Sequence, residues 1–280
     1  MQQKSNSRWS QVASGRSFVI SRNSVVASRW QADCLPYYRW TFSEEKRTAN
    51  DQQRTTSDRR QRVPESSTIR SFFIDGPAGR LEALLNAGSP TATHAAIVCH
   101  PHPLFGGTLH NKVVFHAMKA LNSFGFPVLR FNFRGTGLSE GEHAHGVGEL
   151  EDVRAALDWL EREFPLPVVF AGFSFGAAVG VRAAYSDDRV SALIALGLPA
   201  VAVEDRIYDF DFLRTCSKPK LFVSGSRDQF GPPGKLEALV DTFAEPKKLV
   251  RIEAGDHFFE GRLREMREAI EIWVKECGQA

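Results

Sequence analysis

One stretch decides the fold of this chain: Val168-Val169-Phe170-Ala171-Gly172-Phe173-Ser174-Phe175-Gly176-Ala177-Ala178. An apolar run with β-branched residues stops at Gly172, a serine follows two residues later, and small residues begin a predicted helix. This is G-x-S-x-G between a strand and a helix, a turn in which the serine backbone is strained and the hydroxyl points out above the sheet edge. The flanking glycines let strand and helix pass closer than a Cβ permits. The alternative is an ordinary turn with an incidental serine, which the context on both sides disfavours.

Length and composition favour one large α/β domain. The chain has 280 residues, of which 42% are hydrophobic and 24% charged, enough for a substantial core. The longest nearly apolar run, 190–203, is too short to span a bilayer and contains a proline, and no apolar segment near the N-terminus predicts a secretory signal. The scattered cysteines include no C-x-x-C pair, so we expect a reducing, cytoplasmic location. They are Cys34, Cys99, Cys216 and Cys277.

The first part of the chain differs in composition from the rest. Residues 1–66 hold 12 Lys and Arg against 6 Asp and Glu, whereas the remainder holds 23 against 27. We expect 1–66 to be a disordered basic leader, because it has little apolar surface to bury, and 67–280 to be the domain. The leader resembles an organellar transit peptide in composition, but without a clear amphipathic helix a disordered tail or a mistaken start site is favoured. The domain has no basic stripe with interleaved aromatics, so no nucleic-acid partner is predicted.

Predicted strands and helices alternate along the domain. Such alternation predicts an α/β fold with a mostly parallel sheet, an N-terminal antiparallel hairpin and helices on both faces. The predicted strands are 69–74, 81–85, 95–99, 127–133, 168–172, 191–196, 220–224 and 248–252. The predicted helices are 111–123, 149–164, one after Ser174, 232–243 and 258–275.

Chemistry in such sheets lies beyond the carboxyl ends of the strands. Three strands are followed there by Ser174, Asp228 and His257. A hydroxyl becomes nucleophilic when an imidazole takes its proton, and a buried carboxylate orients that imidazole. Alone, Asp228 could cap a loop and His257 could begin a helix, but together they predict a catalytic triad. Asp256 is a competing acid; since it adjoins His257 in sequence, a side-on pair is awkward, and we expect it to cap the last helix.

The loop 100–108 is the candidate source of an oxyanion hole, which needs two backbone N–H groups. One donor is expected at Phe175, directly after the nucleophile. Since Pro101 and Pro103 lack an N–H, the other must be His102, Leu104 or a neighbour.

Two histidine pairs offer a metal-binding alternative. They are His100 with His102, and His143 with His145. No carboxylate stands at ligand spacing beside the first pair, and both pairs lie in loops with simpler explanations. We therefore predict no metal site and no cofactor.

Several motifs resemble the α/β-hydrolase superfamily, in particular the small bacterial lidless serine hydrolases of the esterase-like or dienelactone-hydrolase-like subgroup. They are Cys99-His100-Pro101-His102-Pro103 with Phe105-Gly106-Gly107, Asn111-Lys112-Val113-Val114, Phe131-Asn132-Phe133-Arg134-Gly135-Thr136-Gly137-Leu138-Ser139, and Gly172 to Gly176. The resemblance covers about residues 68–277 and implies the α/β-hydrolase fold with hydrolase chemistry. By position, His102 corresponds to the loop N–H donor of relatives with a His-Gly-x loop, although Pro101 stands where those carry Gly. True dienelactone hydrolases use a cysteine nucleophile, so Ser174 argues against that activity.

The expected function is a serine hydrolase that cleaves small carboxylic esters through an acyl-enzyme. A thioesterase or an aminopeptidase-like amidase would use the same machinery. A catalytically silent ligand-binding scaffold is a different class, which a complete triad argues against. The segment 197–219 has room for a helix or two but not for a lid domain. We expect the substrate pocket to be lined by Leu104, Phe105, Phe173 and Leu198.

Overall fold

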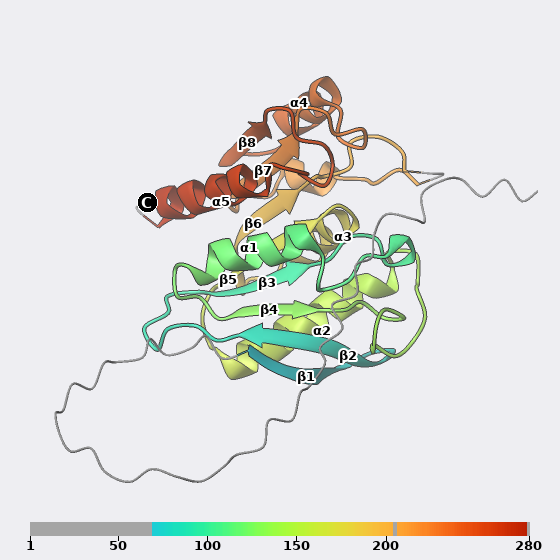
Figure 1. The fold of residues 1–280 in the computed structure, drawn as a ribbon, viewed down its shortest axis with the longest axis vertical. Coiled ribbons are helices and arrows are strands. Elements are labelled where there is room, and N and C mark those ends of the chain that lie inside the picture. The colour runs from blue at the N-terminus through green and yellow to red at the C-terminus, as the bar shows by residue number, and fades with distance from the viewer. Residues whose placement is uncertain (1–68, 204–205, 279–280) are drawn as a thin grey trace, which may run out of the picture. The chain divides into compact units, whose positions relative to one another are not determined.

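The structure is a computed structural model that describes residues 69–203 and 206–278. The predicted leader, 1–66, lies outside the described residues. In the described part, eight strands form one sheet in the order β1-β2-β4-β3-β5-β6-β7-β8 (Figure 1). The strands are β1 (Ile69–Gly76), β2 (Gly79–Asn86), β3 (Ala95–Cys99), β4 (Val128–Phe131), β5 (Val168–Phe173), β6 (Val190–Leu196), β7 (Lys220–Gly225) and β8 (Lys247–Ile252). The helices are α1 (Lys112–Asn122), α2 (Gly148–Glu163), α3 (Phe175–Ala184), α4 (Pro233–Asp241) and α5 (Leu263–Cys277), with 3-10 turns η1 (Pro103–Phe105) and η2 (Asp211–Arg214).

Only β2 runs against the other strands of this sheet. It pairs antiparallel with β1 on one side and with β4 on the other, while every other neighbouring pair is parallel. The mostly parallel sheet with an N-terminal antiparallel hairpin is therefore confirmed. Within it, Gly172 of β5 lies between Cys99 of β3 and Ala195 of β6. This register places the loops after β3, β5 and β6 at the same edge of the sheet.

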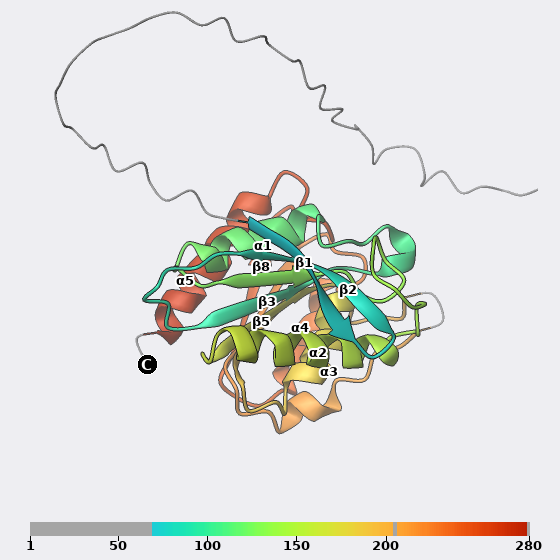
Figure 2. The same cartoon turned by 90° about the horizontal axis from the view of Figure 1, so that it is seen from below.

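Helices cover both faces of the sheet, as predicted. Helices α1 and α5 lie on one face, and α2, α3 and α4 on the other (Figure 2). The alternation within β3 explains why both faces need cover: Ile97 and Cys99 belong to one apolar core, whereas Val98 belongs to the other. Strands buried on both faces read as continuous apolar runs, which is the pattern seen in the sequence.

The last helix begins later than predicted, at Leu263 rather than residue 258. The residues before it form turns, in which Phe259 (φ 54°) and Gly261 (φ 67°) take left-handed backbone angles that a helix cannot contain. The expectation that Asp256 caps this helix is wrong. Its Oδ1 instead accepts a hydrogen bond from the Glu260 N–H at 2.9 Å, inside the preceding turn.

The connection between β6 and β7 contains no lid domain in its described part. It holds η2 and one isolated bridge, Val203 to Arg206. Phe210 and Leu213 are buried and pack into the core beside α3, so the segment lies on the domain.

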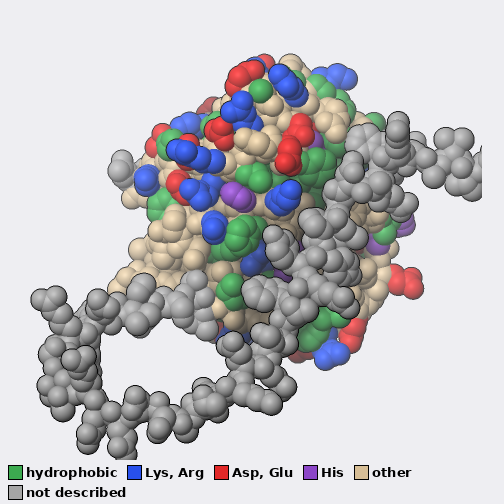
Figure 3. Space-filling view, viewed as in Figure 1, with side chains coloured by type: hydrophobic (Ala, Val, Ile, Leu, Met, Phe, Trp, Pro, Cys, Tyr) green, Lys and Arg blue, Asp and Glu red, His purple; other side chains and the backbone are tan. Residues whose placement is uncertain are grey.

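The face of the molecule near α4, β8 and α5 carries charges of both signs in close alternation (Figure 3). On α5, Arg264 forms an ion pair with Glu268, and Arg267 forms one with Glu271. The two residues of each pair are one helical turn apart. Among residues 69–203 and 206–278, no helix is long and apolar enough to cross a membrane.

Candidate active site

Ser174 lies at the sharp turn between β5 and α3. Its backbone is in a strained conformation for a residue with a side chain, φ 53° and ψ −115°. A Cβ added to Gly172 would lie 2.4 Å from the carbonyl oxygen of Gly176, and one added to Gly176 would lie 2.4 Å from that of His100. Both distances are far below van der Waals contact, so the two glycines are required by close backbone approach.

The three residues predicted from the strand ends meet at this turn. The Oγ of Ser174 lies 3.0 Å from Nε2 of His257. Nδ1 of the same ring lies 2.9 Å and 3.0 Å from the two carboxylate oxygens of Asp228. Because a carboxylate only accepts, Nδ1 carries the proton, which leaves the lone pair of Nε2 facing the serine hydroxyl. That is the arrangement a general base needs.

The carboxylate of Asp228 is buried and fully engaged. It is 2% exposed and accepts hydrogen bonds from the N–H groups of Phe230 (2.9 Å) and Gly231 (3.1 Å), and from Oγ of Ser224 (3.3 Å). Burial alone would raise the pKa of Asp228, but the hydrogen bonds and charge of His257 and the two N–H groups outweigh it and hold the pKa below its ordinary value. The group is therefore an anion at neutral pH.

Three phenylalanine rings surround the imidazole of His257. The ring centroid of Phe230 lies 4.6 Å from it, that of Phe173 5.0 Å and that of Phe258 5.2 Å. Phe173 was predicted to line the pocket, but its side chain is fully buried and packs beside the imidazole. Sequence reasoning missed Phe230 and Phe258. An aspartate that receives an N–H from two residues further on is an Asx-turn pattern, which could have drawn attention to Phe230.

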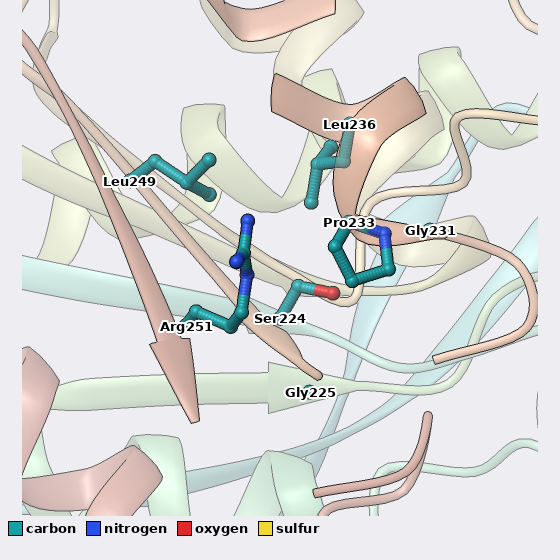
Figure 4. A pocket seen from close by; sticks show the side chains of 7 residues that line it. All are labelled: Ser224, Gly225, Gly231, Pro233, Leu236, Leu249 and Arg251. Atoms are coloured by element: carbon teal, nitrogen blue, oxygen red, sulfur yellow. The ribbon is translucent and has the colours of Figure 1, made fainter. Parts of the chain in front are cut away.

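A small cavity lies between β7, β8 and the start of α4 (Figure 4). Its volume is about 10 Å³, room for about one water molecule, so it cannot hold a substrate. Two of the residues that line it, Ser224 and Gly231, also donate hydrogen bonds to the carboxylate of Asp228. Its lining is Ser224, Gly225, Gly231, Pro233, Leu236, Leu249 and Arg251.

His100 ties the loop after β3 to the end of β4. Its Nε2 accepts a hydrogen bond from the N–H of Phe133 at 3.0 Å, so its Nδ1 carries the proton and donates to the carbonyl of Pro101 at 2.7 Å. Burial lowers the pKa of His100 to about 4. This imidazole is therefore neutral and occupied at both nitrogens, which excludes it as a metal ligand in this conformation.

The same loop engages several of its N–H groups but leaves that of His102 without an acceptor. Four others are engaged within it: Leu104 N–H with Nδ1 of His102, Phe105 and Gly107 N–H with the carbonyl of His102, and Gly106 N–H with the carbonyl of Pro103. Within the described part of the chain, the N–H of His102 has no such partner. Phe175 is the first residue of α3, where an N–H has no partner inside the helix.

The remaining predicted pocket residues differ in exposure. Leu104 and Phe105, on η1, are 65% and 61% exposed and form apolar surface beside His102. Leu198 is 1% exposed and packs into the core, so it presents no open surface. The pocket itself stays a prediction, since the small cavity described above does not adjoin Ser174.

The histidines do not group in space as the two pairs that are close in sequence, His100 with His102 and His143 with His145. His102 lies beside His143, with ring centroids 5.0 Å apart, and His143 beside His145 at 5.2 Å, while His100 stands apart in the core. Burial, with the charges of His143 and Arg206, lowers the pKa of His102 to about 4. No group of three or more His, Cys, Asp or Glu side chains suited to a metal ion occurs among residues 69–203 and 206–278.

Comparisons with known proteins place the chain in one family. Residues 105–279 match a family described as an alpha/beta hydrolase domain. An uncharacterised protein of Rickettsia prowazekii is 36% identical over 211 residues, covering 72% of this chain and 87% of the relative. A solved alpha-beta serine hydrolase homologue from Coxiella burnetii is 38% identical, with TM-score 0.67, over 72% of this chain and 95% of that one. A serine hydrolase without lid from Xanthomonas campestris is 35% identical, with TM-score 0.67, over 74% and 94%.

Proposed function

The chain belongs to the α/β-hydrolase family, and from that membership we propose that it is a serine hydrolase that cleaves small carboxylic esters through an acyl-enzyme. The observation that carries the proposal is the continuous hydrogen-bonded chain from Ser174 through His257 to Asp228. Its solved relatives, themselves named as serine hydrolases, support hydrolytic activity.

In the proposed reaction, Oγ of Ser174 attacks the ester carbonyl while Nε2 of His257 takes its proton. Asp228 holds the imidazole by Nδ1 and stabilises the positive charge that forms there. The N–H groups of Phe175 and His102 donate to the carbonyl oxygen as it becomes an oxyanion. His257 then gives the proton to the leaving alcohol, and an attacking water repeats the sequence to release the acid and free Ser174.

The preference for small acyl groups rests on the segment between β6 and β7. A short connection that packs on the domain, like this one, provides no roof to enclose a long acyl chain. The apolar surface of Leu104 and Phe105 beside His102 is the part of the expected pocket that remains open to a substrate.

A matched panel tests the proposal and its alternatives. The p-nitrophenyl ester, the thioester and the p-nitroanilide of one short acid should be assayed with the wild type and with Ser174→Ala. We expect the ester to be turned over fastest, and Ser174→Ala to fold normally while losing turnover by about 10⁴-fold or more. Faster thioester or anilide cleavage would assign one of the alternatives. No turnover of any substrate would favour a silent scaffold.

We also propose a reducing, cytoplasmic location. The three cysteines of the described part, Cys99, Cys216 and Cys277, are free thiols, which is the state such a compartment maintains.

A further inference from the structure

Four cationic or imidazole side chains gather over the ring of Phe175, next to the proposed oxyanion hole. The ring centroids of His102 and His143 lie 4.7 Å and 5.7 Å from that of Phe175. His145 follows at 5.2 Å from His143. Arg206 reaches the same place, because a Cβ on Gly146 would meet its Nη1 at 3.0 Å and the Phe175 ring at 3.6 Å. We call His102, His143, His145 and Arg206 the imidazole–arginine cluster.

The carboxylate that this cluster contains is already engaged. Glu149 is 0% exposed, and its two oxygens accept hydrogen bonds from the N–H groups of Ala144 (2.8 Å) and Gly146 (2.7 Å). Oε1 also lies 2.8 Å from Nδ1 of His143. Arg206 lies over the ring of Tyr208, with its guanidinium carbon 5.9 Å from the centroid, and its side chain also hydrogen-bonds to that of Tyr208. No acidic side chain among the described residues forms an ion pair with it. Because the hydrogen bonds of Glu149 are made within its own loop, the guanidinium of Arg206 is the one charged group of the cluster left to meet a ligand.

Two of its imidazole nitrogens are available to a ligand. Because Nδ1 of His102 accepts the N–H of Leu104, the proton of the neutral ring is on Nε2, which has no hydrogen-bond partner among the described residues. Nε2 of His143 is buried and has no partner either, on a side chain that is only 8% exposed. Because Nδ1 of this ring faces the carboxylate of Glu149, its proton is on Nδ1, and Nε2 can accept a hydrogen bond but not donate one. Buried polar atoms in native proteins are normally paired, so an unpaired one beside a reactive site is a candidate for contact with a substrate.

We propose that the imidazole–arginine cluster is an anion subsite, and that the preferred substrates are esters whose acyl group ends in a carboxylate. This inference rests on the proposed serine hydrolase function and names its substrate class. The guanidinium of Arg206 matches a carboxylate in shape and charge, and the Nε2–H of His102 supplies a further donor to it.

The position of the cluster assigns the anion to the acyl part of the ester rather than to the alcohol. The leaving alcohol must lie at Nε2 of His257, which protonates it. The cluster instead includes His102 and packs on the ring of Phe175, and the backbone N–H groups of these two residues donate to the carbonyl oxygen of the acyl group. A glutaric monoester, with a short chain between the carbonyl and the carboxylate, is the probe we choose for this class.

The test compares two esters of equal length that differ in charge. The substrates are mono-p-nitrophenyl glutarate and its neutral methyl ester, and the measured quantity is the ratio of their kcat/KM values. We expect the wild type to favour the charged ester tenfold or more, and Arg206→Gln to lower the ratio about tenfold, with Arg206→Lys in between. The control is Arg182→Gln, which removes an exposed charge that pairs with Asp209 on the outer side of α3 and should leave the ratio unchanged.

A binding measurement separates failure of this inference from failure of the proposed function. Titration calorimetry on Ser174→Ala should show binding of glutarate but not of glutaramide, and weaker binding when Arg206→Gln is added. Equal rates for both esters, or no glutarate binding, would overturn the subsite even if neutral esters are cleaved. Tighter binding of inorganic phosphate than of glutarate would assign the cluster to a free anion and would also overturn the inference. Glutarate binding without any ester cleavage would keep the subsite and overturn the hydrolase.

Discussion

Two regions beside Ser174 differ in how many of their polar atoms have hydrogen-bond partners. We call the region of His257 and Asp228 the base flank, and the region of His102 and His143 the loop flank. On the base flank, His257 and Asp228 are each 2% exposed, and every nitrogen and oxygen of the two side chains has a hydrogen-bond partner. On the loop flank, His102 and His143 keep nitrogens without partners in the described structure. Proton transfer is the same for every ester, so its machinery can be closed and fixed. Recognition depends on the acyl group, so its donors must remain free until a substrate arrives.

Burial has opposite consequences on the two flanks. On the base flank, hydrogen bonds to Asp228 overcome desolvation, so its pKa falls below the ordinary value and the charge is kept. On the loop flank, desolvation and neighbouring positive groups lower the pKa of His102 to about 4, so that imidazole stays neutral. The base flank thus keeps the negative charge of Asp228, which stabilises the imidazolium during catalysis. The loop flank instead holds neutral imidazoles around the single guanidinium of Arg206.

The largest expected effect separates the two aspartates beside the base. Asp228→Asn should lower kcat by roughly 10⁴-fold, because an amide favours the wrong tautomer of His257. Asp256→Asn should cost far less, since its carboxylate only receives the N–H of Glu260. Steady-state rates of both variants on one ester, at alkaline pH, decide this. If the order of the two effects were reversed, the acid of the triad would be Asp256.

The loop flank can be disturbed through a glycine. A Cβ on Gly107 would lie 2.2 Å from the carbonyl oxygen of Pro101 and 2.7 Å from that of His102. Gly107→Ala should therefore displace the His102 N–H and lower kcat by about 10²- to 10³-fold, the usual effect of losing one oxyanion donor. Gly106→Ala is the control: its φ of 76° adds strain, but a Cβ there meets nothing within 4 Å. Similar kcat values for the two variants would remove His102 from the oxyanion hole.

The pH dependence of stability tests the anchor of the loop flank. His100 has an ordinary pKa of 6.5 and a folded value of about 4, so the unfolded chain binds more protons between these values. Stability is therefore lost as pH falls from about 6.5 to 4, by about 3 kcal/mol from this residue. Urea unfolding should show that loss in the wild type and in the exposed control His110→Gln, and a shallower one in His100→Gln. An imidazole of His100 that titrates near 6.5 by NMR would contradict the assignment.

The smallest effect concerns acyl length on neutral esters. Each methylene that meets the apolar surface of Leu104 and Phe105 contributes about 0.8 kcal/mol, roughly fourfold in kcat/KM. Activity on p-nitrophenyl esters should rise over the shortest acyl chains and then level off or fall, without a jump when substrate forms micelles. A strong preference for long, aggregated substrates would indicate that the segment between β6 and β7 acts as a lid.

The fold and the chemical centre were predictable because both follow from local patterns. Continuous apolar runs such as Ala95–Cys99 identify strands buried on both faces, and parallel strands bring their carboxyl ends to one edge. Once that edge is known, Ser174, Asp228 and His257 are expected to be neighbours although 83 residues separate the first from the last. The glycines at 172 and 176 follow from the same geometry.

What escaped prediction depends on packing between loops. No sequence spacing relates His102 to His143, or either of them to Arg206, because their contact depends on how three loops fold over α3. The rings of Phe230 and Phe258 reach His257 in the same way, from turns whose backbone angles a residue pattern does not specify. The late start of α5 has the same origin, in the positive φ of Phe259.

The most direct test of the central claim is covalent labelling of the nucleophile. A fluorophosphonate should react once per chain, and peptide mass spectrometry should find the adduct on Ser174, because His257 activates that hydroxyl. Asp228→Asn should label much more slowly, and Ser174→Ala not at all. An adduct on another residue, or labelling of Ser174→Ala at the wild-type rate, would contradict the account.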